Sequence, residues 1–182
     1  SDLAVEHIKE KVDLHLNEKV LSLEADENNN VKSLITDKGK YKVDYVIIAI
    51  GVLPNNDLAK ETGIKLADNG AIIVDREGKT NIDSIYAAGD CATIYDKVLD
   101  EQNYFSLATG ANKLGRMVAS NLVGGHEKFL GSLGSACILA FETEFARTGI
   151  TEEEAKKRNI NYKTVTIKDV DHTHYYPNYE DL

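Results

Sequence analysis

The alternation of apolar and polar positions between residues 20 and 43 predicts three short β-strands. The first strand, with apolar Val20, Leu21, Leu23 and Ala25, ends at the acidic and asparagine-rich turn of residues 26–30. A second strand follows at residues 31–36, a second turn at 37–40, and a third strand at 41–43. Upstream, residues 3–12 have the apolar spacing of a helix. This order predicts a helix followed by a small antiparallel meander.

The next segment, residues 45–51, is apolar without alternation. That pattern is typical of a strand that is buried on both faces in a parallel sheet. Two more strands are predicted at residues 71–75 and 84–88. A meander that leads into buried strands indicates an α/β nucleotide-binding domain with a β-meander crossover.

A long helix is predicted over residues 104–123, because its apolar positions form one stripe and Gly124-Gly125 ends it. The stripe comprises Leu107, Ala111, Leu114, Val118 and Leu122. Beyond it, residues 135–145 and 162–170 are predicted strands. Between them, Thr151 followed by Glu154 has the spacing of a capping box and predicts a short helix that ends near residue 159.

Composition and charge narrow the functional class. The 182 residues are 42% hydrophobic and 28% charged, and no apolar run reaches the ~20 residues of a membrane span. We therefore expect a soluble protein with no membrane partner. The net charge of −9 disfavours nucleic acid as a partner, because phosphate binding needs clustered Lys and Arg. Cys91 and Cys137 lack CxxC spacing, so we expect buried thiols, no disulfide framework and a cytoplasmic location.

The strongest chemical candidate is the Gly89-Asp90 pair at the end of the predicted 84–88 strand. Ligands of open α/β sheets lie at the carboxyl ends of strands. Gly89 allows a ligand to approach the backbone, and the Asp90 carboxylate can accept hydrogen bonds from sugar-type hydroxyls. The alternative interpretation is a plain strand-to-helix turn with Asp90 as the helix N-cap.

Residues 80–90, TNIDSIYAAGD, resemble the second flavin fingerprint of flavoproteins with two dinucleotide-binding domains. The resemblance implies that Asp90 holds the ribityl chain of FAD, beside Gly89. Residues 45–55, YVIIAIGVLPN, resemble the segment with which that family crosses from the NAD(P)H domain back to the FAD domain. It implies that Gly51 lies on the nicotinamide side of the flavin.

Residues 104–116, YFSLATGANKLGR, are similar to the helix that follows this fingerprint in coenzyme A-disulfide reductases and NADH oxidases. The resemblance places the first turn of the helix, supplied here by Leu107, Ala108 and Thr109, beside the flavin ring. Free N–H groups and a partial positive charge at a helix N-terminus would stabilise a reduced, anionic flavin. Leu107 and Ala108 could also be simple core residues.

Near the end of the chain, residues 172–178 resemble a His-x-x-Tyr-Tyr-Pro segment of the coenzyme A-disulfide reductase branch. There a tyrosine reaches the active site of the partner subunit, which makes Tyr175 and Tyr176 the catalytic candidates. The alternative is an aromatic pair at an interface. A metal site of His172 and His174 with Asp169 and Asp171 is disfavoured, because zinc needs three or four ligands in a defined geometry. We expect no metal.

The resemblance covers only the C-terminal part of the family's domain organisation, because both GxGxxG turns and the redox-active cysteine are missing from these residues. It predicts partial FAD/NAD(P)-binding three-layer domains, followed by part of an α+β dimerisation domain. The expected units are the end of the NAD(P)H-binding domain (residues 1–52), the end of the FAD-binding domain (53–124) and the start of the dimerisation domain (125–182).

The resemblance also implies an activity for the parent protein, whereas we expect these residues alone to be inactive. The parent is expected to be an FAD-dependent NAD(P)H:disulfide oxidoreductase and a homodimer. Hydride passes from NAD(P)H to FAD, and electrons then reach a cysteine outside this chain that reduces a small disulfide, coenzyme A disulfide above all. Two alternatives stay open: an NADH oxidase or peroxidase of the same superfamily, and a non-catalytic dimerisation module.

Overall fold

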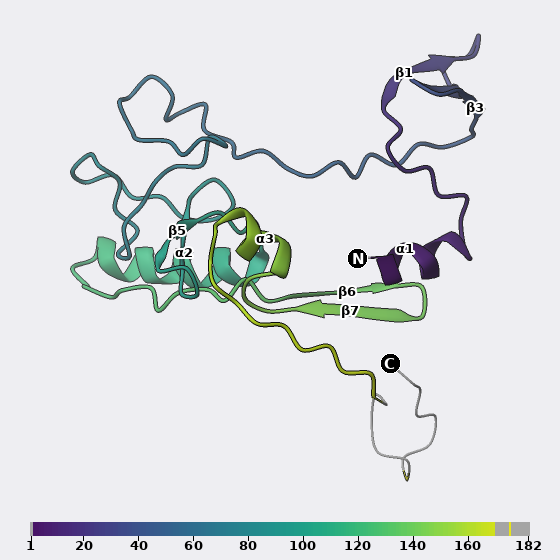
Figure 1. The fold of residues 1–182 in the computed structure, drawn as a ribbon. Helices are drawn as coiled ribbons and strands as arrows, with labels where there is room; N and C mark the ends of the chain where they lie inside the picture. The colour runs from purple at the N-terminus through teal and green to yellow at the C-terminus, as the bar shows by residue number, and fades with distance from the viewer. Residues whose placement is uncertain (1, 170–174, 176–182) are drawn as a thin grey trace.

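The computed structural model describes residues 2–169 and residue 175, and has mixed α/β content. Figure 1 shows a small meander that stands apart from a larger body built around α2, with a long extended segment between them. No helix in the described part of the chain is long and apolar enough to span a membrane.

The predicted helix and meander at the amino end are confirmed. Helix α1 spans Asp2–Lys9, and the three-stranded sheet has the order β1 (Val20–Ala25), β2 (Val31–Thr36) and β3 (Lys40–Lys42). Both pairings are antiparallel, with Leu23 opposite Leu34 and Leu34 opposite Tyr41. The Asp26 carboxylate closes the first turn by accepting the amides of Asn28 and Asn30, as expected of an Asx turn.

The buried strand predicted at residues 45–51 is wrong for the described chain. The segment is extended but pairs with no described strand, and Ile47 and Ile50 are each 91% exposed. An unbroken apolar run indicates a tendency to be buried, but burial needs neighbouring strands and covering helices. The described residues bring neither to this segment (Figure 1).

The strands predicted at residues 71–75 and 84–88 are reduced to isolated bridges. Ile72 pairs with Leu66 and with Ala92, and Tyr86 pairs with Lys79. These single bridges still connect the turns of residues 63–92, in which Ala71 and Val74 are buried. Short pairings of this kind satisfy backbone groups without a continuous ladder.

The core of the body lies beneath α2, which spans Ala108–Leu122 and starts four residues later than predicted. The side chains of Leu114, Met117 and Val118 form the buried cluster, and partly buried Tyr86, Ala88 and Phe129 pack against it. Gly78 makes this packing possible, because a Cβ there would lie 2.3 Å from Val118 Cγ2. The segment that leads to Gly89 is thereby packed on α2 through Tyr86 and Ala88.

Two hairpins and a short helix complete the described fold. Strands β4 (Ile94–Asp96) and β5 (Glu101–Asn103) pair in one hairpin, and β6 (Ala136–Ala140) and β7 (Thr143–Arg147) pair in the other. The single strand predicted over 135–145 is therefore a hairpin. Helix α3 covers Glu152–Lys157, and the Thr151 hydroxyl accepts the Glu154 amide as predicted. The strand predicted at 162–170 is wrong, because described residues 162–169 form no strand.

Candidate functional site

The Gly89-Asp90 turn is built by the loop that precedes it. The Thr80 amide and hydroxyl both donate to the Ile85 carbonyl, at 2.9 and 3.0 Å, and the Ala87 amide donates to the Gly78 carbonyl at 3.0 Å. Through its bonds to Ile85, Thr80, the first residue of the fingerprint, stabilises the loop. Thr80 closes the loop that precedes residues 85–90, and Tyr86 and Ala88 of this segment pack against α2.

The turn itself is open. Gly89 has φ +95°, a conformation that favours glycine, and a Cβ placed there would meet nothing within 4 Å. Asp90 is exposed, and its carboxylate makes no hydrogen bond or ion pair with the described residues. It does not cap α2, because the N-cap position is Leu107. The structure therefore disfavours the plain capping interpretation of Asp90.

A tyrosine ties this turn to the start of α2. The Tyr104 hydroxyl donates a hydrogen bond of 2.8 Å to the Asp90 carbonyl. Tyr104 lies just before the helix, which begins at Ala108. The bond therefore ties the Gly89-Asp90 turn to the segment just before the first turn of α2, although the two are separate in the sequence.

The first turn of α2 keeps its hydrogen-bonding capacity. Leu107 has an extended backbone and no side-chain oxygen to cap the helix, so the first N–H groups lack a side-chain acceptor. The first turn contains no acidic residue, and Ala108 and Thr109 are exposed. Gly110 lets the helix approach β4, because a Cβ there would lie 2.9 Å from Ile94 Cδ1. The helix end thus presents donors and a partial positive charge.

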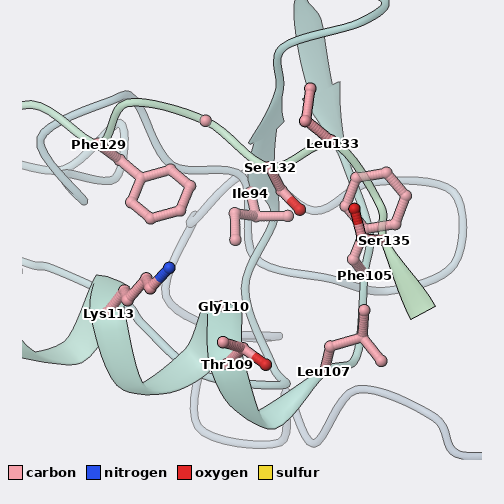
Figure 2. Close-up of a pocket in the computed structure, with 11 residues that line it drawn as sticks. Ile94, Phe105, Leu107, Thr109, Gly110, Lys113, Phe129, Ser132, Leu133 and Ser135 are labelled. Atoms are coloured by element: carbon pink, nitrogen blue, oxygen red, sulfur yellow. The ribbon is translucent and has the colours of Figure 1, made fainter. Parts of the chain in front are cut away.

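A cavity of about 340 Å³ adjoins this helix end. Figure 2 shows Thr109, Gly110 and Lys113 of α2 on one side, and Phe129, Ser132 and Leu133 on the other. Its walls are formed by Ile94, Phe105, Leu107, Thr109, Gly110, Lys113, Phe129, Gly131, Ser132, Leu133 and Ser135. Lys113 is the one charged side chain among these, so the charge of the cavity is positive on the side of the helix. Apolar and aromatic walls with a few polar groups are typical of a small-molecule site.

The structure gathers some of the sequence-predicted site residues and separates others. Leu107 and Thr109 line the cavity, whereas Gly89, Asp90 and Ala108 do not. Asp90 is tied to the segment before α2 only by its backbone carbonyl, which accepts the Tyr104 hydroxyl. Gly51 does not line the cavity either, because it lies in the extended, exposed 45–53 segment. Tyr175 is 82% exposed, and Tyr176 lies outside the described residues.

The two cysteines differ in their surroundings, and the predicted histidine pair lies outside the described residues. Cys91 is partly buried and its thiol donates to the Ala88 carbonyl at 3.6 Å, whereas Cys137 is exposed, which corrects the packing role expected for it. Both thiols are free, in line with the absence of a disulfide framework. Residues 2–169 and 175 contain no group of three metal-ligating side chains, and His172 and His174 lie outside them.

Comparison with known proteins matches this architecture to redox enzymes. The family model for pyridine nucleotide-disulphide oxidoreductases matches residues 2–115. The NAD(P)H sulfur oxidoreductase (CoA-dependent) of Pyrococcus furiosus is 38% identical over 177 residues, which cover 97% of this chain and 40% of that protein.

Solved structures show the same likeness. The water-forming NADH oxidase from Lactobacillus brevis, bound to NADH, is 31% identical with a TM-score of 0.87 over 99% of this chain and 40% of that one. An NAD-dependent persulfide reductase from A. fulgidus is 31% identical with a TM-score of 0.88, over 99% of this chain and 33% of that one. The chain spans about two fifths of the length of the curated relative. Since the family model matches more than half of the chain, the chain belongs to the pyridine nucleotide-disulphide oxidoreductase family.

Proposed function

We propose that the complete gene product is an FAD-dependent NAD(P)H oxidoreductase that reduces a low-molecular-weight disulfide, with coenzyme A disulfide as its substrate. The observation that carries the proposal is the 2.8 Å bond from Tyr104 to the Asp90 carbonyl. It ties the turn that carries the open Asp90 carboxylate to the segment before the uncapped end of α2. The carboxylate and the helix end are complementary to two different parts of a flavin. The family assignment supports the same class of chemistry.

The residues present fit a flavin. The unpartnered Asp90 carboxylate would accept hydrogen bonds from the ribityl hydroxyls, and the open space at Gly89 leaves room for them. Backbone amides of the turn formed by Leu107, Ala108 and Thr109 would bind the ring and stabilise negative charge on it. Gly51 would lie towards the nicotinamide of NAD(P)H. When bound, FAD supplies two-electron redox chemistry between NAD(P)H and the acceptor.

The overall reaction balances with one disulfide as the acceptor. One NAD(P)H and one proton reduce one disulfide to two thiols and leave NAD(P)⁺. A cysteine outside this chain attacks the disulfide sulfur as a thiolate. Within this chain, Tyr175 or Tyr176 would donate a hydrogen bond to a thiolate or substrate sulfur across a homodimer.

The arrangement of the chain supports three units. We propose residues 1–52 as the end of the NAD(P)H-binding domain, 53–124 as the end of the FAD-binding domain and 125–182 as the start of the dimerisation domain. The extended segment that carries Gly51 separates the meander from the body near the first boundary (Figure 1). Exposed Ile138, Leu139 and Phe141 on the β6–β7 hairpin support a homodimer, because apolar side chains on a protruding hairpin favour burial against a partner. We place the protein in the cytoplasm.

Two similarities bear on the substrate. The CoA-dependent enzyme of Pyrococcus furiosus and the A. fulgidus persulfide reductase act on sulfur compounds by their names, which supports a disulfide acceptor. The likeness to the water-forming NADH oxidase from Lactobacillus brevis favours the second candidate, an NADH oxidase that reduces oxygen. The disulfide is proposed first because the Tyr175-Tyr176-Pro177 segment resembles the coenzyme A-disulfide reductase branch.

Product analysis of the purified, complete gene product separates the candidates. NADH oxidation is followed under air without a disulfide, and under nitrogen with coenzyme A disulfide, while free thiols are counted. The proposal expects two thiols per NADH under nitrogen. Fast NADH oxidation under air without thiol formation under nitrogen would select the oxidase. A colourless protein with neither activity would select the dimerisation module.

A further inference from the structure

The segment of residues 127–135 forms one wall of the cavity beside α2, and it is bound to the body along its length. The Phe129 amide donates to the Arg76 carbonyl at 2.7 Å, and the Ser132 amide donates to the Tyr95 carbonyl at 2.8 Å. The Lys97 amide returns a bond of 2.9 Å to the Ser132 carbonyl. Five of the cavity residues, Phe129, Gly131, Ser132, Leu133 and Ser135, come from this segment.

Arg76 holds the segment with its side chain as well as its backbone. Its Nε donates a bond of 3.0 Å to the Phe129 carbonyl, so Arg76 and Phe129 exchange two hydrogen bonds. The guanidinium carbon also lies 4.4 Å from the centroid of the Tyr95 ring, within range of a cation–π contact. Tyr95 is held in turn by a bond of 2.5 Å from its hydroxyl to Asp100.

The contacts of Arg76 differ from those of an ordinary surface cation. Within the described residues, the guanidinium makes no ion pair. Its contacts are a carbonyl and an aromatic ring, and both belong to elements that bear on the cavity. Gly131 shows how closely the segment approaches the same ring, because a Cβ there would lie 2.9 Å from Tyr95 Cδ1. Arg76 therefore ties the segment, at Phe129, to Tyr95 of β4.

Phe129 connects the contacts of Arg76 to the wall of the cavity. Its carbonyl and amide bind Arg76, whereas its ring lines the cavity opposite Lys113 and packs against the core of α2 (Figure 2). A shift of the Phe129 backbone would therefore move the ring and change the shape of the cavity. Arg76 itself does not line the cavity.

We propose that Arg76 is a positioning residue: it holds the 127–135 segment so that Phe129 closes the cavity beside the first turn of α2 and sets the environment of the bound flavin ring. The proposal rests on the proposed function, because the flavin gives the cavity its role. It assigns to Arg76 an effect on the cofactor without direct contact with it.

The test compares wild type, Arg76→Ala, Arg76→Lys and the matched control Lys79→Gln in the complete gene product. Lys79 lies in the same loop and pairs with Glu77, but it does not bind the 127–135 segment. Hydrogen–deuterium exchange at the Phe129 and Ser132 amides measures how firmly the 127–135 segment is hydrogen-bonded to the body. The dissociation constant and the absorption band of FAD measure how the cavity binds the flavin and what environment it gives the ring. The kcat and KM for NADH measure turnover.

For Arg76→Ala we expect exchange at both amides to rise about tenfold, as for the loss of the Nε–Phe129 hydrogen bond together with the cation–π contact to Tyr95. FAD affinity should fall several-fold and the flavin band should shift. Arg76→Lys keeps a cation near Tyr95 and should restore part of each effect. Lys79→Gln should behave as wild type. If Arg76→Ala does not fold, we expect Arg76→Lys to show smaller increases in amide exchange, a smaller loss of FAD affinity and a smaller shift of the flavin band.

Three results would overturn the proposal. Unchanged exchange in a folded Arg76→Ala or Arg76→Lys protein would show that Arg76 does not hold the segment. Faster exchange with an unchanged flavin band and affinity would make Arg76 a purely structural contact. A wild-type protein without flavin would refute the proposed function, and with it the role of the cavity, whereas failure of the inference alone leaves wild type fully loaded with FAD.

Discussion

The Tyr104 hydroxyl donates a hydrogen bond to the carbonyl oxygen of Asp90, fourteen residues earlier in the chain. The bond leaves the Asp90 carboxylate itself free to face outwards, because Tyr104 binds the backbone and not the side chain. It also fixes the chain just before α2. A single neutral hydrogen bond thus ties the turn that carries Asp90 to the segment before α2, the two parts to which we assign the flavin.

The first prediction concerns this bond. Tyr104→Phe keeps the ring and removes the hydroxyl, so the Gly89-Asp90 turn loses its tie to α2. We expect FAD affinity to fall about fivefold, the equivalent of roughly one neutral hydrogen bond. Fluorescence titration with FAD measures it. Tyr162→Phe, which removes a hydroxyl bound to Glu152 on α3, is the control and should leave affinity unchanged.

The second prediction concerns the core that carries the site. Leu114 is 3% exposed and Leu122 is 61% exposed, although both belong to the apolar stripe of α2. Leu114→Ala should lower the free energy of unfolding by about 2–5 kcal/mol, because it leaves a cavity in the core. Leu122→Ala should change it by less than about 0.5 kcal/mol. Urea denaturation measures both, and equal losses would contradict the assigned core.

The third prediction concerns pH. His15 lies between Asp13 and Glu18, with nitrogen–oxygen distances of 3.1 and 3.0 Å. Hydrogen bonds to Asp13 and then to Glu18 raise the pKa of His15 above its usual value of 6.5. The Tyr41 hydroxyl also lies 3.1 Å from His15 Nδ1. The imidazole therefore links the segment before β1 to the meander.

The sign of the pH effect follows from the raised pKa of His15. Its contribution to stability is complete below the unfolded pKa of about 6.5 and is lost as pH rises through the folded value. The difference in melting temperature between wild type and His15→Gln should therefore be largest near pH 6 and shrink at alkaline pH. NMR titration of the ring should give a pKa above 6.5. A difference in melting temperature that grows with pH would contradict this account.

Local signals in the sequence predicted the elements that depend on local chemistry. The turn at residues 26–30 and the cap at Thr151 are present because their hydrogen-bond partners lie within a few residues. The apolar stripe around Leu114 is present because the helix period places its core positions on one face. The prediction failed where partners are distant. Residues 45–51 have the composition of a buried strand, but the described chain offers them no neighbouring strand.

Three features had weak or misleading signals. The β6–β7 hairpin turns at Phe141, with φ +56°, where no Gly or Asn-Gly pair marks the turn. Tyr104 belonged to a recognised segment, yet nothing in its spacing indicated that its hydroxyl would reach Asp90. Arg76 likewise lies in an ordinary Asp-Arg-Glu-Gly turn. Side-chain contacts across long stretches of sequence are decided by the tertiary fold, and one sequence does not reveal them.

The most direct test of the central claim is FAD binding by the complete gene product with Asp90→Asn. This change keeps the size of the side chain and removes the charge that strengthens its hydrogen bonds to hydroxyls. Asp83→Asn, at an exposed carboxylate in the preceding loop, is the matched control. Wild type and Asp83→Asn should bind one FAD per chain, and Asp90→Asn should bind about tenfold to a hundredfold more weakly. Equal FAD affinity in all three proteins, or no flavin in wild type, would contradict the account.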